Sequence, residues 1–163
     1  FRSNKWILWN SWTKGPNLDK IIDLKVSDLK IFNDDRGSLL HILSSSKEPE
    51  FIFGECYASE TKPGVIKAWK KHQEVSQNIC VIEGEVKLVI IDLRSSSKTY
   101  NIVNEIYLSR DNYKLVHIPK ELWYGFKCVS KSKSIIINCI DKPYDKEETV
   151  SCSIDELPFK YEW

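Results

Sequence analysis

Two side chains that can carry protons, Lys70 and His72, stand one residue apart in a stretch of mixed basic and hydrophobic residues. If this stretch is extended, its side chains alternate between two faces, so Lys70 and His72 share a face with Ala68, whereas Lys67 and Trp69 fall on the other. A lysine is rarely found in a protein interior unless that interior is wet and functional. The pattern therefore predicts a ligand pocket with this strand as its floor. The alternative is a polar edge strand whose lysines lie in solvent.

The composition limits the classes of partner. The chain has 163 residues, with 24 Lys and Arg against 23 Asp and Glu. This predicts one domain and gives no electrostatic reason to bind nucleic acid or an anionic membrane. No apolar run approaches the roughly 18 residues that span a bilayer. The five cysteines form no CxxC pair, which indicates reduced thiols, no zinc site and a cytoplasmic location.

Hydrophobic runs separated by turn residues predict an all-β chain. The expected strands cover residues 21–30, 38–43, 50–59, 64–78, 79–82, 86–92, 101–108, 113–118 and 134–140. Residues 119–126 are interpreted as a tight aromatic connection, and 141–163 as a tail with little regular structure. Many short strands without a helix indicate an antiparallel sandwich or barrel. We expect one such domain over residues 21–163, preceded by an N-terminal arm over residues 1–20.

The histidines do not form a predicted metal site. His72 has no companion ligand at metal-binding spacing, and His41 and His117 lie on other expected strands. His117 stands in an apolar run and is interpreted as a core histidine with a bonded ring. His41 is equally compatible with the pocket and with the surface.

Several motifs follow one another along the chain in a characteristic order. They are Asp35-Arg36-Gly37, Pro63-Gly64-Val65-Ile66-Lys67-Ala68-Trp69 with His72 beyond it, Glu83-Gly84-Glu85-Val86 leading to Asp92-Leu93-Arg94, Ile118-Pro119 with Trp123-Tyr124-Gly125-Phe126, Asn138-Cys139, Pro143-Tyr144-Asp145 and Tyr161-Glu162-Trp163. In this order they resemble the dTDP-4-dehydrorhamnose 3,5-epimerase family of cupins, and most of all its divergent members that end in a Tyr-acid-Trp tripeptide. The resemblance covers the chain from about residue 21 to its end.

The resemblance implies a fold and a chemistry. The fold would be a cupin-type jelly-roll barrel in a homodimer. The substrate would be a nucleotide-linked 4-keto-6-deoxysugar, with dTDP as the expected nucleotide, and no metal or other cofactor would take part. Protons next to a ketone are weakly acidic, so a base removes one while a cationic or hydrogen-bonding group stabilises the enolate oxygen. A second group then returns a proton to the opposite face.

The family's proton-carrying residues are only partly matched. By the resemblance, the base His of the family falls on Lys70, its acid Tyr on Asn138, and a second family tyrosine on Tyr144. We expect the catalytic roles to fall to Lys70, His72 and Tyr144. A Lys70 buried beside other cations would serve as a base or as a clamp on the enolate. His72 would serve as the base because an imidazole titrates near neutrality.

The same motifs supply the expected substrate-binding residues, which are Arg36, Lys67, Asn78, Trp123, Tyr124 and Asn138. Arg36 and Lys67 fall where the family places cations on the diphosphate, and Tyr124 falls where it has a His at the barrel mouth. Trp123 is expected to stack on a base or a sugar.

Two classes of function remain open at this point. The first is an epimerase that acts at one or both carbons beside the ketone of a nucleotide sugar. The second is a non-catalytic cupin that binds a sugar nucleotide or a carbohydrate and has lost the His and Tyr pair of the family. Exchange of substrate protons with solvent distinguishes the two.

Overall fold

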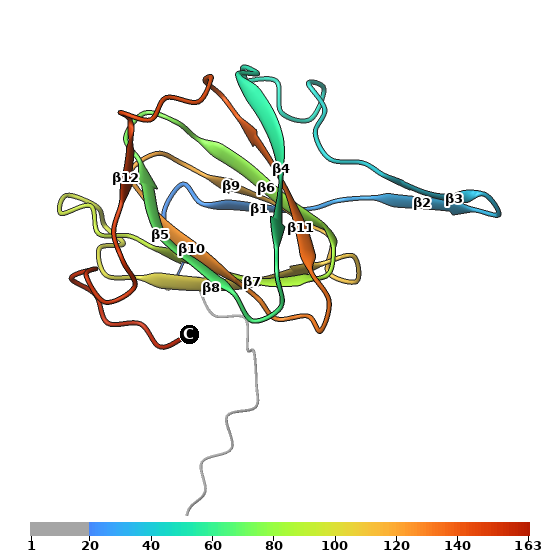
Figure 1. Cartoon of the computed structure of the whole chain (residues 1–163). Helices are drawn as coiled ribbons and strands as arrows, with labels where there is room; N and C mark the ends of the chain where they lie inside the picture. The colour runs from blue at the N-terminus through green and yellow to red at the C-terminus, as the bar shows by residue number, and fades with distance from the viewer. Residues whose placement is uncertain (1–19) are drawn as a thin grey trace, which may run out of the picture.

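The computed structural model describes residues 20–163, and every regular element in this part of the chain is a β-strand (Figure 1). The strands are β1 (Lys25–Asp28), β2 (Ile31–Asp34), β3 (Gly37–Leu40), β4 (Glu55–Thr61), β5 (Ile66–His72), β6 (Gln77–Glu83), β7 (Glu85–Ile91), β8 (Val103–Ser109), β9 (Lys114–Ile118), β10 (Trp123–Cys128), β11 (Ser134–Ile140) and β12 (Thr149–Ser151). No helix of the described residues is long and apolar enough to cross a membrane. Apart from Lys20, the arm predicted over residues 1–20 lies outside the described residues.

Two five-stranded sheets form the body of the molecule. The first has the strand order β1-β9-β6-β11-β4 and the second β12-β5-β10-β7-β8. Every pairing is antiparallel, as the short strands and turn residues predict. The expected strand over 134–140 agrees with β11, and most of the others overlap an observed strand with different ends. The expected strand over 64–78 was too long, because β5 ends at His72 and β6 begins at Gln77, and β2 was not expected.

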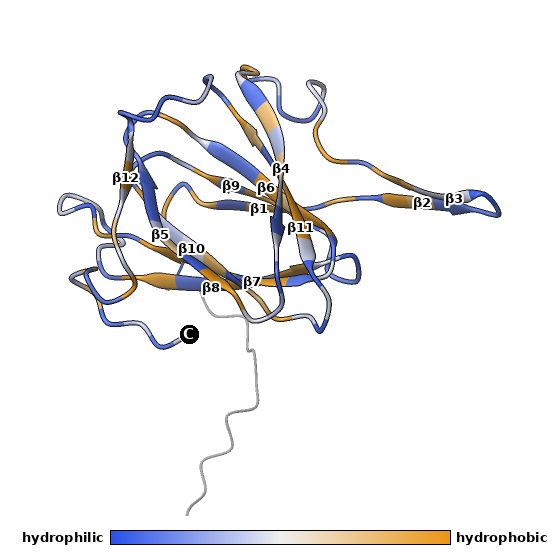
Figure 2. Cartoon of the chain, viewed as in Figure 1, coloured by the Kyte–Doolittle hydropathy of each residue, from blue (hydrophilic) through white to orange (hydrophobic). Residues whose placement is uncertain are grey.

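The main hydrophobic core lies between the two sheets. Inward side chains of β6, β9 and β11 meet those of β7 and β10, and the largest of them are Ile79, Leu88, Ile90, Ile118 and Tyr124. Each buried aliphatic side chain of this size contributes about 1.5–3 kcal/mol to folding. Figure 2 shows hydrophobic residues along the strands and hydrophilic residues in most of the loops.

The C-terminal tail covers the outer face of the second sheet. Trp69 of β5 is almost fully buried there and packs against Tyr161 and Trp163, with ring centroids 5.8 and 5.0 Å away. Leu157 joins the same cluster. The tail also forms β12, which pairs with β5. The prediction of little regular structure after residue 140 was therefore wrong at β12, whose three residues are ordered by a long-range pairing.

The aromatic segment after Pro119 also differs from its prediction. Residues 119–126 were interpreted as a connection, but Trp123 begins β10, which lies between β5 and β7 in the centre of the second sheet. Both neighbours of β10 hydrogen-bond to it. The aromatic and glycine residues are thus strand residues, because aromatic side chains fit the surface of a sheet covered on both faces.

The hairpin β2–β3 stands apart from both sheets. It projects away from the barrel (Figure 1), and Arg36 lies at its turn. Phe32 and Leu39 on this hairpin are 55% and 61% exposed. A two-stranded ribbon is at best marginally stable in water.

Candidate active site

A cavity of about 340 Å³ is lined by strands of both sheets and by the segment that leads into β12. Tyr57 comes from β4, Lys70 and His72 from β5, and Tyr124 from β10. The other lining residues are Val75, Ile140, Tyr144, Lys146, Glu148, Thr149 and Ser151. Lys70 and His72 thus face one cavity, as the spacing of two residues predicts. The cavity combines one histidine, two lysines, one carboxylate and three phenols.

An irregularity in β5 sets which residues face the cavity. Tyr124 is opposite Lys70 and Phe126 is opposite Lys67. Two residues of β5, Ala68 and Trp69, are therefore opposite one residue of β10, Gly125. Such a bulge shifts the alternation of side chains by one position. Ala68 and Trp69 both pack on the outer face. The prediction that Ala68 shares a face with Lys70 and His72 was therefore wrong.

The residue opposite this bulge is Gly125. A Cβ atom built on Gly125 would lie 2.4 Å from the Ala68 side chain and 3.0 Å from Trp163. The position therefore requires a glycine, because no larger residue fits between β5 and the C-terminal tail.

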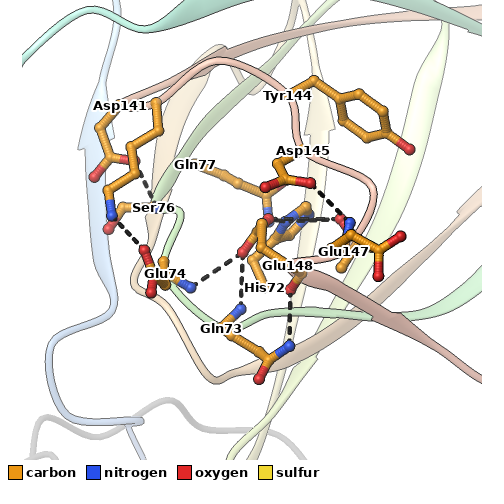
Figure 3. A network of polar contacts seen from close by, with 12 residues as sticks. His72, Gln73, Glu74, Ser76, Gln77, Asp141, Tyr144, Asp145, Glu147 and Glu148 are labelled. Carbon is orange, nitrogen blue, oxygen red and sulfur yellow. Dashed lines mark hydrogen bonds and ion pairs between the residues drawn. The ribbon is translucent and has the colours of Figure 1, made fainter.

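His72 is held by a carboxylate from the far end of the chain. Only 7% of His72 is exposed, and its ring nitrogen Nδ1 contacts the carboxylate of Glu148. The second carboxylate oxygen of Glu148 accepts hydrogen bonds from the backbone N–H groups of Gln73 and Glu74, at 3.0 and 3.1 Å. Figure 3 shows Glu148 between these groups. The pairing of Thr149 in β12 with His72 in β5 places Glu148 there.

These contacts determine the charge and the orientation of the pair. Burial alone would raise the pKa of Glu148, but the hydrogen bond with His72 and those from the backbone of Glu74 and Gln73 lower it. An ionised carboxylate accepts a hydrogen bond from the Nδ1–H group, so the neutral imidazole carries its free electron pair on Nε2. Nε2 lies 3.3 Å from the hydroxyl of Tyr124, which also lines the cavity.

A chain of amides connects two of the phenols. Asn138 donates through Nδ2 to the hydroxyl of Tyr57 at 2.9 Å and to Oε1 of Gln77 at 2.8 Å. Gln77 in turn hydrogen-bonds to Tyr124. Burial raises the pKa of both phenols, and the hydrogen bonds from Asn138 and Gln77 offset only part of that effect. Both hydroxyl groups therefore keep their protons at neutral pH.

The hydroxyl proton of Tyr57 is available to the cavity. Its oxygen already accepts a hydrogen bond from Asn138, and no described residue accepts its proton. Oδ1 of Asn138, on a residue only 5% exposed, also has no hydrogen-bond partner among the described residues. Buried polar atoms are rarely left unpaired, so this corner of the molecule is prepared for a polar ligand.

The structure places Lys70 and Tyr144 at the open part of the cavity. Lys70 is exposed, so the burial that would turn it into a base is not present. Its ammonium group suits a developing negative charge instead. Tyr144 is 62% exposed on the segment after β11, where its backbone N–H donates to Glu55 at 2.8 Å.

Two other predicted binding residues, Lys67 and Arg36, do not line the cavity. Lys67 donates from Nζ to the backbone oxygen of Glu60 at 2.8 Å and to Ser59 at 3.2 Å. Arg36 is on the projecting hairpin, paired with Asp34. Within one chain, the structure does not bring Arg36 to the cavity.

Asn78 and Trp123 face away from the cavity. Asn78 accepts a hydrogen bond at 3.1 Å from Nδ1 of His117, on the outer face of the first sheet. Trp123 lies outside the second sheet, with the ammonium group of Lys71 5.1 Å from its ring centroid. In both places the neighbouring residue, Gln77 or Tyr124, occupies the inner face instead.

Three residues of the site were missed from the sequence. Glu148 lies in the tail, and only the pairing of β12 brings it to His72. Gln77 begins a run buried on both faces, where hydropathy does not mark the inner side. Tyr57 alternates with Cys56 and Ala58 in β4 and could have been found from that alternation. Among the described residues, no three His, Cys, Asp or Glu side chains form a group that could hold a metal ion.

Two antiparallel sheets around an open cavity with a histidine, lysines and phenols define a cupin-type jelly roll with a small-molecule site. The model of the dTDP-4-dehydrorhamnose 3,5-epimerase family matches residues 19–163, and the chain belongs to this family. A probable low-salt glycan biosynthesis epimerase, Agl13 of Haloferax volcanii, is 31% identical over 134 residues, which are 80% of this chain and 85% of that protein. The family and this relative therefore support a role as an epimerase or isomerase of sugar biosynthesis.

Solved structures show the same fold. A dTDP sugar isomerase from Desulfovibrio desulfuricans G20 is 32% identical with a TM-score of 0.82, and the match covers 86% of this chain and 91% of that one. A dTDP-6-deoxy-D-glucose-3,5-epimerase from Legionella pneumophila, solved with dTDP-4-keto-L-rhamnose, is 24% identical with a TM-score of 0.79, over 88% of this chain and 80% of that one. The predicted jelly-roll fold is thus confirmed.

Proposed function

We propose that this protein epimerises a dTDP-linked 4-keto-6-deoxysugar at one or both carbons beside the ketone. The observation that carries the proposal is His72, oriented by an ionised Glu148 in a cavity that also holds lysines and phenols. The relatives named above include an enzyme solved with a dTDP-linked keto sugar. The chemistry needs a base, a group that stabilises the enolate and a proton donor, and the cavity contains a candidate for each.

His72 is the base in this proposal. Nε2 removes the proton from the carbon beside the ketone, the C–H electron pair forms the carbon–carbon double bond of the enolate, and the carbonyl electron pair moves to oxygen. Glu148 then faces an imidazolium, and its negative charge stabilises that cation. Lys70 stabilises the enolate oxygen through its ammonium group.

Tyr57 is the preferred donor for the opposite face. When the enolate returns to the ketone, the carbon takes the phenolic proton. The His72 imidazolium then releases its proton to water and the phenolate takes one from water, so both groups return to their starting states. The hydrogen bond from Asn138 orients Tyr57 and stabilises that phenolate. Tyr144 is the second candidate, because it lines the same cavity, but none of the described residues fixes its hydroxyl group.

A second copy of the chain completes the proposal. The hydrophobic residues Phe32 and Leu39 on the projecting hairpin need a cover, and a homodimer would provide it and would carry Arg36 toward the diphosphate in the partner's cavity. Lys67, on the same strand as Lys70 and His72, would bind the same diphosphate. We also retain a cytoplasmic location as a prediction, because all five cysteines are free thiols.

The experiment is proton exchange in D2O. A dTDP-4-keto-6-deoxyhexose is incubated with the protein, and deuterium at C3 and C5 is followed by NMR against a sample without protein. We expect faster exchange at one or both carbons and a product of inverted configuration.

A non-catalytic binding module is the second candidate function. The observation that favours it is the exposed Lys70 at the position of the family's base, together with Asn138 at the position of its acid. Saturable binding of the dTDP-hexose by calorimetry without any acceleration of exchange would select this candidate. Exchange above the background would exclude it.

A further inference from the structure

Two cysteines on neighbouring strands contact each other on the outer face of the first sheet. Cys56 in the edge strand β4 is directly opposite Cys139 in β11. The sulfur atoms are 3.0 Å apart, with the Cys139 thiol donating to the sulfur of Cys56. The sequence separation of 83 residues makes this a long-range contact. The site described above does not use either thiol.

The backbone pattern shows what kind of pair this is. The carbonyl of Ile140 accepts a hydrogen bond from Gly54, on the β4 side, whereas the N–H of Asp141 donates to Ser76, on the β6 side. The backbone groups of successive strand residues point to opposite sides. Those of Cys139 therefore point to β6, and Cys56 and Cys139 form a non-hydrogen-bonded pair.

This type of pair has the geometry that a disulfide requires. Directly opposite residues at non-hydrogen-bonded positions have Cα atoms about 4.5 Å apart, and disulfides span Cα separations of roughly 4.4–6.8 Å. Cys80 is the only other cysteine on this face among the described residues, and its register partner in β11 is Ile137. Cys80 is therefore diagonal to Cys139, at roughly 7–8 Å, which is too far for a bridge.

The two thiols differ in access. Cys56 is exposed, whereas Cys139 is buried. Burial, followed by the contact with Cys56, raises the pKa of the Cys139 thiol. An exposed thiol next to a buried one suits a two-step reaction. The exposed thiol forms a mixed disulfide with a solute, and the buried thiol then displaces the solute.

We propose that Cys56 and Cys139 are an oxidation site that a small-molecule disulfide converts into an internal disulfide across strands β4 and β11. The Cys56 thiolate attacks the small disulfide, forms a mixed disulfide and releases one thiol. Cys139 then loses its proton and attacks the sulfur of Cys56, which releases the second thiol. The protein loses two electrons and two protons, and the small disulfide gains them.

The internal disulfide would link the edge strand β4 covalently to β11, next to two residues of the candidate active site. Tyr57 and Asn138 are the next residues on the opposite face, and they hydrogen-bond across the same two strands. Closing a long loop restricts the unfolded chain. We expect the oxidised protein to melt roughly 5–15 °C higher than the reduced protein. This proposal does not depend on the reaction assigned to the cavity.

The test uses the full chain in buffers of graded ratios of oxidised to reduced glutathione. After acid quench and alkylation, intact mass spectrometry is expected to show a lighter species that carries two alkyl groups fewer than the reduced protein, and a non-reducing peptide map is expected to join the peptides of Cys56 and Cys139. Melting temperatures are measured on the same samples.

Matched variants make the result decisive. Cys56→Ser and Cys139→Ser are each expected to lose the lighter species and the rise in melting temperature, while Cys152→Ser retains both. The proposal is overturned if the oxidised wild-type protein carries only glutathione adducts, if it links two chains through Cys56, or if the lighter species persists in Cys139→Ser.

Discussion

Two cavities of similar size in this protein each contain a histidine, and their surroundings differ in charge. The cavity of His72 measures about 340 Å³ and that of His117 about 330 Å³. His72 is bonded to the carboxylate of Glu148, whereas His117 is bonded to the amide of Asn78. A carboxylate stabilises an imidazolium, and a neutral amide does so much less. The proposal that His72 is the base rests on this difference between the two partners.

The second histidine is adapted to remain neutral. Burial, followed by the positive charge of Lys25, lowers the pKa of His117, and the negative charges of Asp141 and Glu48 offset only part of this. The comparison teaches that burial and a hydrogen bond do not by themselves make a histidine a base. The two histidines differ in the charge of the hydrogen-bond partner and in the phenols, which line the cavity of His72 but not that of His117.

The largest predicted effect separates the two histidines directly. His72→Gln removes the base and is expected to lower the rate of deuterium exchange into a dTDP-4-keto-6-deoxyhexose by about 10³-fold. His117→Gln is the matched control and is expected to stay within about two-fold of wild type. Equal losses in both variants would break the comparison.

The second largest effect is expected from a tyrosine. Of the two cavities, that of His72 contains phenols and that of His117 does not. Tyr57→Phe keeps the ring and removes the proton donor, so net inversion of the sugar is expected to fall about 10²-fold. Proton removal by His72 is expected to continue, so deuterium exchange falls less than inversion does. Tyr144→Phe is the matched control, and a larger loss in that variant than in Tyr57→Phe would transfer the role to Tyr144.

Removing the charge of Glu148 makes the first cavity more like the second. Glu148→Gln is expected to lower kcat for epimerisation about 10-fold, the lower end for groups that orient a histidine, with little change in KM.

Because Glu148 has a lowered pKa in the folded protein, its contribution to stability is present above about pH 4.3 and is lost as the pH falls through the folded-state value. Thermal melts between pH 3 and 7 would show a weaker acid dependence in the variant, and identical pH profiles would contradict this assignment.

The smallest effect belongs to His117. Because its pKa is lowered in the folded protein, the unfolded chain binds the proton more readily below about pH 6.5. Stability is therefore expected to fall as the pH drops from about 6.5 toward the folded-state value, and to fall less in His117→Gln. Melting temperatures of both proteins between pH 5 and 8 would show the difference, and a steeper loss in the variant would contradict the assignment.

The sequence was sufficient for the local pattern of the site and insufficient for its long-range contacts. Lys70 and His72 are two residues apart, so a strand alone places them on one face. Lys67 and Ala68 were assigned to the wrong faces because the bulge opposite Gly125 shifts the alternation. Local sequence gives little indication of a bulge that depends on a pairing between distant strands.

In two strands that are buried on both faces, the sequence did not indicate which residues face the cavity. The run from Gln77 to Val81 is buried throughout, so hydropathy could not tell that Gln77 rather than Asn78 faces inward. The same holds for Trp123 and Tyr124 in β10, which is covered by the C-terminal tail on its outer face. Glu148 could not be found because its contact with His72 spans 76 residues and depends on the pairing of β12.

The most direct measurement follows both histidines in one sample. The chain has three histidines, so NMR of protein labelled in the imidazole ring yields few signals, which single His→Gln variants assign. On titration with a dTDP-linked 4-keto-6-deoxyhexose, the signals of His72 are expected to shift and those of His117 to stay in place. Shifts at His117 with none at His72 would contradict the account.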